Sequence, residues 1–413
     1  MRDGNQGTGK ADGAPAPVGD AAPEPAFGTA PGGAGRGVRL RAWLWRLRDR
    51  LVASRTFRNA AASFPLTRPM ARRNARALFD LCAGFVYSQV LATCVRLDVF
   101  ALLAERPRTA AEIGALTGLP ESGADRLLAA AVSLRLADRR PNGRYGLGLL
   151  GAAVHGDPGI RAMIAHHHLL YDDLADPVPL LKGEAGQTRL GAYWAYAGRA
   201  ASDADAPGAA IGADAVDAYS GLMAASQAMV VDEVVAAYPF RRHGHLLDVG
   251  GGDARFVAGV SAVAPALRLT VFDLPAVAER AQAALDRAGL ARRAHAVGGD
   301  FTVDALPAGA DLISLVRIVH DHDEPVVRAL LSRAHDALAS GGTLLIAEPM
   351  AETPGAEPVG DAYFGFYLLA MGSGRPRSRA HLTRLLEAAG FTDVREHSTR
   401  QPMIVRVLSA RKQ

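Results

Sequence analysis

The segment 315–324, LVRIVHDHDE, places two histidines among carboxylates directly after a run of apolar residues. Histidine titrates near neutral pH, so His320 or His322 can take a proton from a hydroxyl group, and Asp321 or Asp323 stands beside the imidazole. The same residue types also bind metal ions, but adjacent side chains do not converge easily on one ion. We therefore expect a general base here and no metal site.

Further carboxylates follow other apolar runs. Glu348, in the segment IAEP, can orient a catalytic histidine and stabilise its protonated form. Asp300, in the segment GGDF, can accept a hydrogen bond from an adenine amine, and the neighbouring Phe301 can cover the ring. The alternative for this second segment is an ordinary turn at the end of a strand.

A glycine-rich turn follows the apolar run at 245–249, and a second apolar run ends in Asp273 roughly 20 residues later. Gly250 and Gly252 lack a Cβ atom, so the backbone can turn tightly and a ligand can lie against it. Asp273 is placed to accept hydrogen bonds from both hydroxyls of a ribose. The arrangement predicts a site for a cofactor that contains adenosine.

The spacing of the glycines indicates which cofactor this is. A dinucleotide fingerprint needs a small residue at position 255, where Arg255 would obstruct packing at the start of the helix. The pattern D-x-G-x-G-x-G fits better, as Asp248, Gly250, Gly252 and Ala254, with only its last position altered. This is the pattern of S-adenosylmethionine sites, where no phosphate is bound and an acidic residue can meet the methionine ammonium. The plain alternative is a strand, turn and helix that happen to contain three glycines.

These side chains need a scaffold that brings them to one edge. Apolar runs with strand character alternate with helical patterns, at 245–249, 268–272, 294–297, 311–316 and 343–347. The alternation predicts an α/β domain with a Rossmann-like, mostly parallel sheet and helices on both faces. Ligands of such sheets lie beyond the carboxyl ends of the strands, and Asp248, Asp273, Asp300 and His320 all stand at or just after strand ends.

The part of the chain before this domain is mainly helical. Helical patterns run over 75–104, 109–117 and 122–132. Thr109 and Glu112 have the spacing of a capping box, and Asn142 with Gly143 marks the tip of a hairpin. Two helices joined by a turn and followed by a hairpin predict a winged helix.

A winged helix often binds DNA, so a DNA-binding regulator is a genuine alternative for this part of the chain. The second helix, however, is rich in Ala and Leu and carries only Asp125 and Arg126 as charged residues. Such a helix suits burial better than a major groove, where contacts need Arg, Lys, Asn or Gln. We therefore expect a dimerisation module and no nucleic acid partner.

The N-terminal region has two distinct compositions. Residues 1–37 consist largely of Gly, Ala and Pro and bury too little apolar surface to offset the entropy of ordering, so we predict a disordered tail. Residues 38–58 form a basic amphipathic pattern with Trp43 and Trp45. Such a helix fits a membrane interface, where arginine meets anionic headgroups. The alternative is a helix that packs on the protein body with its arginines in solvent.

Composition sets wider limits. A chain of 413 residues with 49% apolar residues predicts two domains with substantial cores, and the net charge of +4 is small. Cys82 and Cys94 lack metal-ligand spacing and make a weak case for a disulfide, which favours a reduced cytoplasmic setting, with peripheral membrane contact through residues 38–58. No uncharged apolar run reaches 18 residues, so a membrane-spanning helix is not indicated.

Two further segments carry more than one interpretation. The triplet His166-His167-His168 faces different sides of a helix, which favours a structural or surface role over a metal site. Residues 361–371 are rich in aromatic side chains and are predicted to form the wall of a deep apolar pocket. The same segment also fits a core or dimer helix, and both interpretations can hold.

The chain resembles the two-domain S-adenosylmethionine-dependent O-methyltransferases of the acetylserotonin and caffeate type. The resemblance covers about residues 75–410 and rests on LDVGGG (247–252), FD (272–273), GDF (299–301), VHD (319–321), AEP (347–349) and AGF (389–391). It implies a winged-helix domain that mediates dimerisation, with His320 as the general base and Glu348 as an orienting carboxylate. It also implies Asp273 at the ribose, and Asp300 with Phe301 at the adenine.

Two positions depart from the pattern of the plant members. Val316, with Arg317 beside it, stands where they usually carry lysine four residues before the base. The segment before the last helix reads RPRS at 375–378, where they carry a second glutamate that flanks the base. Orientation of His320 is then expected to come mostly from Glu348 or from another group.

A closer resemblance is to the bacterial carotenoid O-methyltransferases that methylate the 1-hydroxyl group of acyclic carotenoids. It rests on ARALFDLCAGFVYSQV (75–90), LVRIVHDHD (315–323) and GDAYFGFYLLAMGSGR (360–375). Members that methylate phenols usually have Trp where His322 stands. The likeness implies an acceptor of the demethylspheroidene or hydroxyneurosporene type.

The site residues are therefore assigned in three groups. His320 and Glu348 are assigned to catalysis. The residues assigned to S-adenosyl-L-methionine are Asp248, Gly250, Gly252, Asp273, Leu274, Asp300, Phe301 and Arg317. The residues assigned to a hydrophobic acceptor are Met223, Asp321, Tyr363, Phe364, Tyr367 and Met371.

We expect a homodimer in which each chain consists of four segments. The parts are the tail at 1–37, a basic segment at 38–70, a helical winged-helix dimerisation domain at 71–215 and a methyltransferase domain at 216–413. Two other functions remain open. One is methylation of a phenolic or polyketide product, and the other is a winged-helix regulator that binds S-adenosylmethionine without catalysis.

Overall fold

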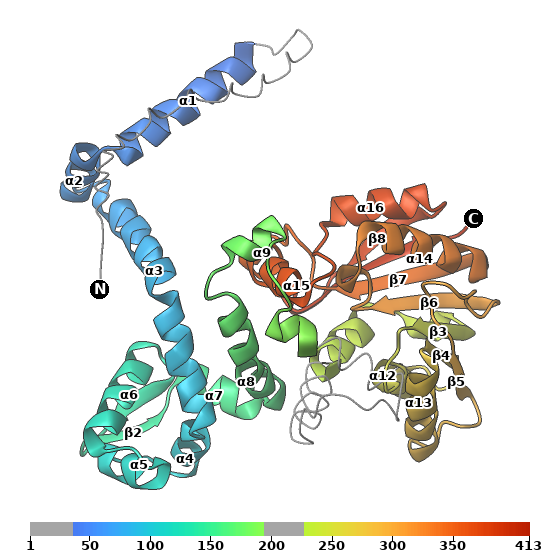
Figure 1. The fold of residues 1–413 in the computed structure, drawn as a ribbon, viewed down its shortest axis with the longest axis horizontal. Coiled ribbons are helices and arrows are strands. Elements are labelled where there is room, and N and C mark those ends of the chain that lie inside the picture. The colour runs from blue at the N-terminus through green and yellow to red at the C-terminus, as the bar shows by residue number, and fades with distance from the viewer. Residues whose placement is uncertain (1–35, 194–226) are drawn as a thin grey trace, which may run out of the picture. The chain divides into compact units, whose positions relative to one another are not determined.

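The computed structural model describes residues 36–193 and 227–413 (Figure 1). The chain divides into two compact units, one up to Gly84 and one from Phe85 onward. Most of the predicted tail and the predicted acceptor residue Met223 lie outside the described residues.

The first unit contains α1 (Arg36–Ala53), α2 (Arg55–Ser63) and the start of α3 (Arg68–Arg96). The helix predicted over 38–58 is present but breaks at Ser54, whose side chain accepts a hydrogen bond from the N–H of Phe57 and caps α2. Arg58 donates to the last carbonyls of α1, those of Val52 and Ala53, at 2.8 and 2.7 Å. One helix therefore ends where the next begins.

Helix α3 combines length with an apolar composition. By these two criteria alone, it is the single helix within the described ranges that could cross a membrane. Asp80 interrupts the apolar run, which is why no uncharged run of 18 residues exists in the sequence. The core helix of a soluble protein meets the same criteria, so they are weak evidence for a membrane span.

The second unit begins with the end of α3, and the single helix predicted over 75–104 is in fact two. Asp98 has a left-handed φ of 51° and separates α3 from α4 (Val99–Glu105). The winged helix then follows as α5 (Ala110–Thr117), α6 (Glu121–Ser133), β1 (Ala137–Arg140) and β2 (Arg144–Leu147). The predicted capping box of Thr109 and Glu112 is confirmed, and Asn142 and Gly143 turn the hairpin at φ 58° and 65°.

Helix α6 is used for packing. It buries Ala124, Leu128 and Ala131, and the carboxylate of Asp125 accepts a hydrogen bond from the Tyr145 hydroxyl at 2.9 Å. Three helices continue the chain, α7 (Leu149–Gly156), α8 (Pro158–Asp173) and α9 (Val178–Lys182).

A seven-stranded sheet forms the rest of the unit, in the order β5-β4-β3-β6-β7-β9-β8. Its strands are β3 (His245–Val249), β4 (Arg268–Asp273), β5 (Ala294–Gly298), β6 (Ala310–Val316), β7 (Leu338–Glu348), β8 (Thr392–His397) and β9 (Arg406–Arg411). The first five in this order are parallel, which confirms the predicted mostly parallel sheet. The antiparallel pair β8 and β9 extends one edge and was not predicted.

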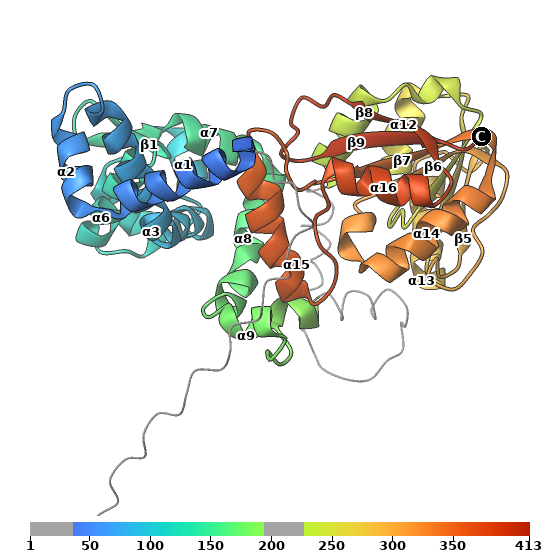
Figure 2. The same ribbon diagram turned by 90° about the horizontal axis from the view of Figure 1, so that it is seen from above.

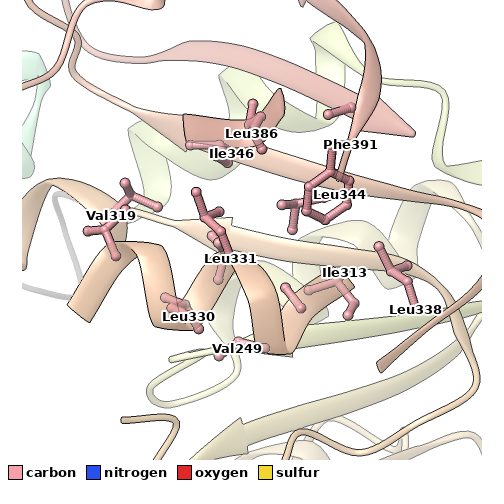
Figure 3. Packing of buried hydrophobic residues seen from close by; sticks show 14 of the residues in the cluster. Val249, Ile313, Val319, Leu330, Leu331, Leu338, Leu344, Ile346, Leu386 and Phe391 are labelled. Carbon is pink, nitrogen blue, oxygen red and sulfur yellow. The ribbon is translucent and has the colours of Figure 1, made fainter. Parts of the chain in front are cut away.

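Both faces of the sheet are buried, because successive side chains of each strand point to opposite sides. On one face Leu344 and Ile346 pack with residues of α14 (Glu324–Ala337) and α16 (Arg379–Ala388) (Figure 3). On the other face Leu345 and Ala347 belong to a core with α12 (Arg255–Val263), α13 (Pro275–Arg287) and the helix at 227–237. Helices therefore cover the sheet on both sides.

The chain order of the strands decides where a ligand can lie. From β3 the chain moves outward through β4 to β5, and then returns to the other side of β3 for β6 and β7. A crevice opens at such a reversal, beyond the carboxyl ends of the strands. The residues predicted for catalysis and for the cofactor lie at or just after the carboxyl ends of these five strands.

One wall of this region comes from elements far apart in sequence. The π-helix η3 (Pro358–Phe364) runs into α15 (Gly365–Met371), and α15 lies beside α8 (Figure 2). Leu170 of α8 and Ala370 of α15 share a small apolar core. A π-helix often marks a functional site, and this one begins the predicted acceptor wall.

Candidate active site

The loop after β3 needs its glycines. Gly250 and Gly252 have φ values of 71° and 54°, in the left-handed region that glycine enters without strain. A Cβ atom on Gly250 would lie 2.3 Å from the Cδ1 atom of Ile318, so a larger residue would displace that side chain. Ala254, at the altered last position of the pattern, also has a left-handed φ of 61°. The loop thus adopts at Ala254 a conformation that glycine would favour.

Asp273 ties this loop to the end of β4. Its Oδ2 atom accepts the N–H of Gly252 at 2.8 Å, and its Oδ1 atom accepts the N–H of Leu274 at 2.8 Å. Burial raises the pKa of the Asp273 carboxyl, while these two donors lower it. Each carboxylate oxygen has a second lone pair, so the group can still accept hydrogen bonds from a diol.

Asp248 is the most deeply placed carboxylate of the loop region, with 1% of its surface exposed. It accepts a hydrogen bond from the Ser314 hydroxyl at 2.6 Å, and burial raises its pKa to about 7. A nearby cation favours the charged form of such a group. The hydrogen-bond acceptors Asp248 and Asp273 therefore fit a ligand that carries both a diol and an ammonium, as S-adenosylmethionine does.

A cavity of about 180 Å³ lies against the loop. Its lining includes the predicted residues Asp248, Gly250, Gly252, Arg317, His320, Asp321, Phe364, Tyr367 and Met371. Asp273, Leu274, Asp300 and Phe301 do not line it. The carboxylate of Asp300 accepts hydrogen bonds from the N–H and hydroxyl of Thr302 in its own turn, and Phe301 meets the ring of His322 edge-on at 5.2 Å.

His320 sits in the 3-10 turn η2 (Val319–Asp321) with 2% of its surface exposed. Its Nε2 atom lies 3.0 Å from the Oδ1 atom of Asp321, and its ring stacks on Phe364 at 6.0 Å between centroids. Glu348 is fully buried and accepts the backbone N–H of His320 at 3.0 Å. Asp321 therefore contacts the imidazole, whereas Glu348 holds the main chain beneath it.

The charges around His320 and its burial shift the pKa of its imidazole in opposite directions. Burial lowers the pKa of the imidazole, but the Asp321 and Glu348 carboxylates outweigh burial and raise the pKa above its ordinary value, with Arg317 acting against them. Burial raises the pKa of Asp321, yet His320 and Arg317 hold it below the usual range. The imidazole and Asp321 therefore form a polar pair that can hold a proton.

A second cavity of about 650 Å³ adjoins the first. Val230, Arg317, Phe364 and Tyr367 line both cavities. The larger cavity is mostly apolar and aromatic, with Ile160, Met163, Val359, Tyr363, Met403 and Ile404 in its lining. The shared residues connect this cavity with the smaller one, whose lining includes His320.

Two residues of the histidine triplet line this second cavity, a role that the sequence prediction missed. The Nε2 atoms of His166 and His167 lie 3.0 and 2.7 Å from the hydroxyls of Tyr367 and Tyr363. Burial lowers the pKa of His166 to about 4 and also lowers that of His167, so both are neutral at physiological pH. His168 is largely exposed, as expected for three successive helical positions. Within residues 36–193 and 227–413 no group of three or more His, Cys, Asp or Glu could hold a metal ion.

Comparison with known proteins agrees with this geometry. Residues 79–154 match the O-methyltransferase dimerisation domain, and residues 184–392 match the O-methyltransferase domain. The demethylspheroidene O-methyltransferase of Cereibacter sphaeroides is 41% identical over 369 residues, which cover 89% of this chain and 95% of the relative. That of Rhodobacter capsulatus is 39% identical over 366 residues, 88% of either chain.

Among solved structures, the S-adenosylmethionine-dependent methyltransferase SibL in its apo form has a TM-score of 0.69 at 25% identity. The match covers 81% of this chain and 98% of SibL. The two domain matches span the winged helix and most of the sheet described above. The chain belongs to the family of two-domain S-adenosylmethionine-dependent O-methyltransferases and is an enzyme of that class.

Proposed function

We propose that this enzyme methylates the tertiary 1-hydroxyl group of an acyclic carotenoid, with His320 as the general base. The observation that carries the proposal is the apolar, aromatic cavity of about 650 Å³ that adjoins the smaller cavity, whose lining includes His320. Such a cavity suits a long hydrocarbon whose hydroxylated end must reach the base. The 41% and 39% identity to two demethylspheroidene O-methyltransferases supports this class of acceptor.

The residues of the glycine loop would hold the methyl donor. Asp248 would meet its ammonium, Asp273 its ribose, and the backbone at Gly250 and Gly252 would lie against it. Bound S-adenosylmethionine supplies a methyl group on a positively charged sulfur. The protein contributes by holding the two reactants in line, by excluding water and by removing a proton.

His320 would remove the proton of the acceptor hydroxyl. A tertiary alcohol is a far weaker acid than a phenol, so proton removal should accompany methyl transfer rather than precede it. The contact of Asp321 with Nε2 stabilises the imidazolium that forms. Glu348 fixes the backbone of the base through the N–H of His320.

Replacing Asp273 by Asn should weaken the binding of S-adenosylmethionine about tenfold or more, because hydrogen bonds to a charged acceptor contribute about 1.5–3 kcal/mol. Isothermal titration calorimetry measures this affinity directly. The matched control is Asp286→Asn, which changes an exposed carboxylate of α13 that bonds Gln282. Equal affinity of Asp273→Asn and wild type would contradict the assignment.

Incubation with labelled S-adenosylmethionine should transfer label to a 1-hydroxylated acyclic carotenoid and not to a panel of phenols. His320→Ala should lower the rate by a factor of about 100 to 10,000, the usual contribution of a general base, with the affinity for S-adenosylmethionine intact. Label in the phenols alone would establish the phenolic alternative. A near-normal rate of His320→Ala would remove the base assignment.

Activity should fall as the pH drops through the raised pKa of His320, because only the neutral imidazole accepts a proton. Asp321→Asn removes the larger of the two contributions that raise this pKa, so the acid limb of kcat/KM should move to lower pH. The control Asp336→Asn changes an exposed carboxylate next to His335 and should leave the limb in place. An acid limb that Asp321→Asn does not move would argue against His320 as the titrating base.

We further propose that α1 rests on an anionic membrane surface, which would bring the enzyme to a membrane-dissolved acceptor. Leu40, Trp43, Leu44, Leu47 and Leu51 share one side of the helix by its 3.6-residue period and are all exposed. Trp43 and Trp45 are 57% and 58% exposed. An exposed apolar stripe with tryptophan is typical of an interfacial helix.

The arginines of α1 are placed to support that contact. By the same helical period, Arg41 and Arg48 flank one side of the apolar stripe, and Arg46 and Arg50 flank the other. Arg48 also pairs with Asp49 at 2.7 Å. Long basic side chains beside an apolar stripe can reach lipid headgroups while their stems stay at the interface.

In flotation with anionic liposomes, Trp43→Ser with Leu47→Ser should lose most of the recovery of the full-length chain. Replacing Arg46, Arg48 and Arg50 by Gln should weaken binding roughly 100-fold, since each basic residue contributes about 1 kcal/mol at such a surface. Leu149→Ser with Leu181→Ser is the matched control, because both leucines are exposed outside this helix. Equal recovery of the full-length chain and a chain lacking residues 1–58 would disprove the contact.

The homodimer expected from the sequence remains a prediction. It is supported by the match of residues 79–154 to a dimerisation domain and by the exposed apolar side chains of α3, Leu78, Phe79, Leu81, Phe85 and Val86. Sedimentation equilibrium would give twice the chain mass of 43.2 kDa for a dimer, and a single chain mass would reject it.

A further inference from the structure

The segment between α15 and α16, residues 373–377, lies against the turn that carries His320, and we call it the strap. The hydroxyl of Ser373 donates to the carbonyl of Asp321 at 3.0 Å. The backbone N–H of Arg375 donates to the carbonyl of His320 at 2.9 Å. The strap therefore holds the main chain of both members of the imidazole–carboxylate pair.

Arg377 completes this set of contacts. Its guanidinium donates through Nη1 to the carbonyl of Val319 at 2.7 Å and through Nη2 to the carbonyl of His322 at 2.8 Å. Four consecutive carbonyls, those of residues 319–322, thus each receive a hydrogen bond from the strap. Arg377 bridges the two ends of the turn with one rigid planar group.

The backbone of the strap at Gly374 lies close to the backbone of the turn. Gly374 has a φ of 80°, and a Cβ atom there would lie 2.2 Å from the carbonyl oxygen of His320. Its N–H donates to the carboxylate of Asp323 at 3.1 Å. A glycine at this position permits the contact between the strap and the turn.

Arg377 carries its charge in a buried position. Only 1% of its surface is exposed, and burial lowers the pKa of its guanidinium, with the charge of Glu348 acting in the opposite direction. A buried cation needs compensation from hydrogen bonds or opposite charge. Arg377 obtains it from the carbonyls that flank His320 and from Glu348, the same carboxylate that accepts the N–H of His320.

We propose that Arg377 is a positioning residue for methyl transfer, which acts through the carbonyls of Val319 and His322 to hold His320 and Asp321 in register. The inference rests on the proposed role of His320 as base. Plant members carry a second glutamate that flanks the base, and this chain has RPRS at 375–378 instead. The carboxylate that contacts the ring of His320 here is Asp321, on the same turn. A carboxylate adjacent in sequence keeps its contact with the ring only while the turn keeps its shape.

The test compares Arg377→Lys, Arg377→Met and Ser373→Ala with the control Arg379→Gln, which removes an exposed guanidinium that pairs with Glu396. Binding of S-adenosylmethionine is measured by calorimetry, and kcat, KM and the pH profile are measured with the same acceptor. We expect kcat to fall about 100-fold in Arg377→Met, as for a small misplacement of a catalytic group, and about tenfold in Arg377→Lys, which keeps the charge. The affinity for S-adenosylmethionine should stay at the wild-type value.

The acid limb of the pH profile separates positioning from a general structural role. The groups that face His320 are Asp321 on its own turn, Glu348 at the end of β7 and Arg317 at the end of β6. A looser turn weakens the pairing with Asp321, so the acid limb should move to lower pH in both Arg377 variants, slightly in Ser373→Ala, and not in Arg379→Gln.

Folded Arg377 variants with wild-type kcat and an unmoved acid limb would overturn the proposal, as would a loss of affinity for S-adenosylmethionine equal to the loss of kcat. If Arg377→Met does not fold, the acid limbs of the pH profiles of Arg377→Lys and Ser373→Ala test the proposal in its place. Failure of the underlying function is distinguishable: an active His320→Ala rejects the base itself. An inactive His320→Ala with wild-type Arg377 variants rejects only the positioning role.

Discussion

Burial of ionisable groups at the carboxyl edge of the sheet is the constraint on which the site depends. His320, Glu348 and Arg377 are each at most 2% exposed, and they lie within one small region together with Asp321. Charges removed from water are tolerated only when opposite charges and hydrogen bonds replace the solvent. Here the replacement comes from the Asp321 and Glu348 carboxylates and from the main chain of one short turn, so the chemistry of the site depends on the backbone geometry of that turn.

The buried groups also bear on the two cavities, because His320 and Asp321 line the smaller one. The small cavity follows the glycine loop and the large one follows η3, α8 and α15, and they share Phe364 and Tyr367. Phe364 also stacks on His320, so one side chain contacts both cavities and the proposed base. The neutral pairs of His166 with Tyr367 and of His167 with Tyr363 stiffen that wall without adding charge to an apolar site.

Much of the scaffold could be predicted because its signals are local. The five parallel strands could be predicted from apolar runs that alternate with helical patterns. The loop at 248–254 could be predicted from glycines at fixed spacing. The breaks at Ser54 and Asp98 were missed because apolar periodicity continues across them, while single residues decide the backbone. Strand β8 was missed because charged residues interrupt its pattern, and β9 because only four uncharged residues lie between its terminal arginines. The placement of His166 and His167 depends on packing of α8 against α15 and η3, which no local pattern encodes.

The site shows the same division between local and long-range signals. His320, Glu348 and the loop were predictable as types of residue at strand ends, but their partners were not. Glu348 was expected to orient the ring, yet its hydrogen bond goes to the backbone N–H of His320, while Asp321, assigned to the acceptor, contacts Nε2. The contact between these two adjacent side chains depends on the internal shape of the turn, and the strap donates hydrogen bonds to the four carbonyls of residues 319–322. In the sequence, the segment RPRS at 375–378 meant that orientation of His320 had to come from Glu348 or another group. In the fold its second arginine donates hydrogen bonds to the carbonyls of Val319 and His322, on either side of His320 and Asp321.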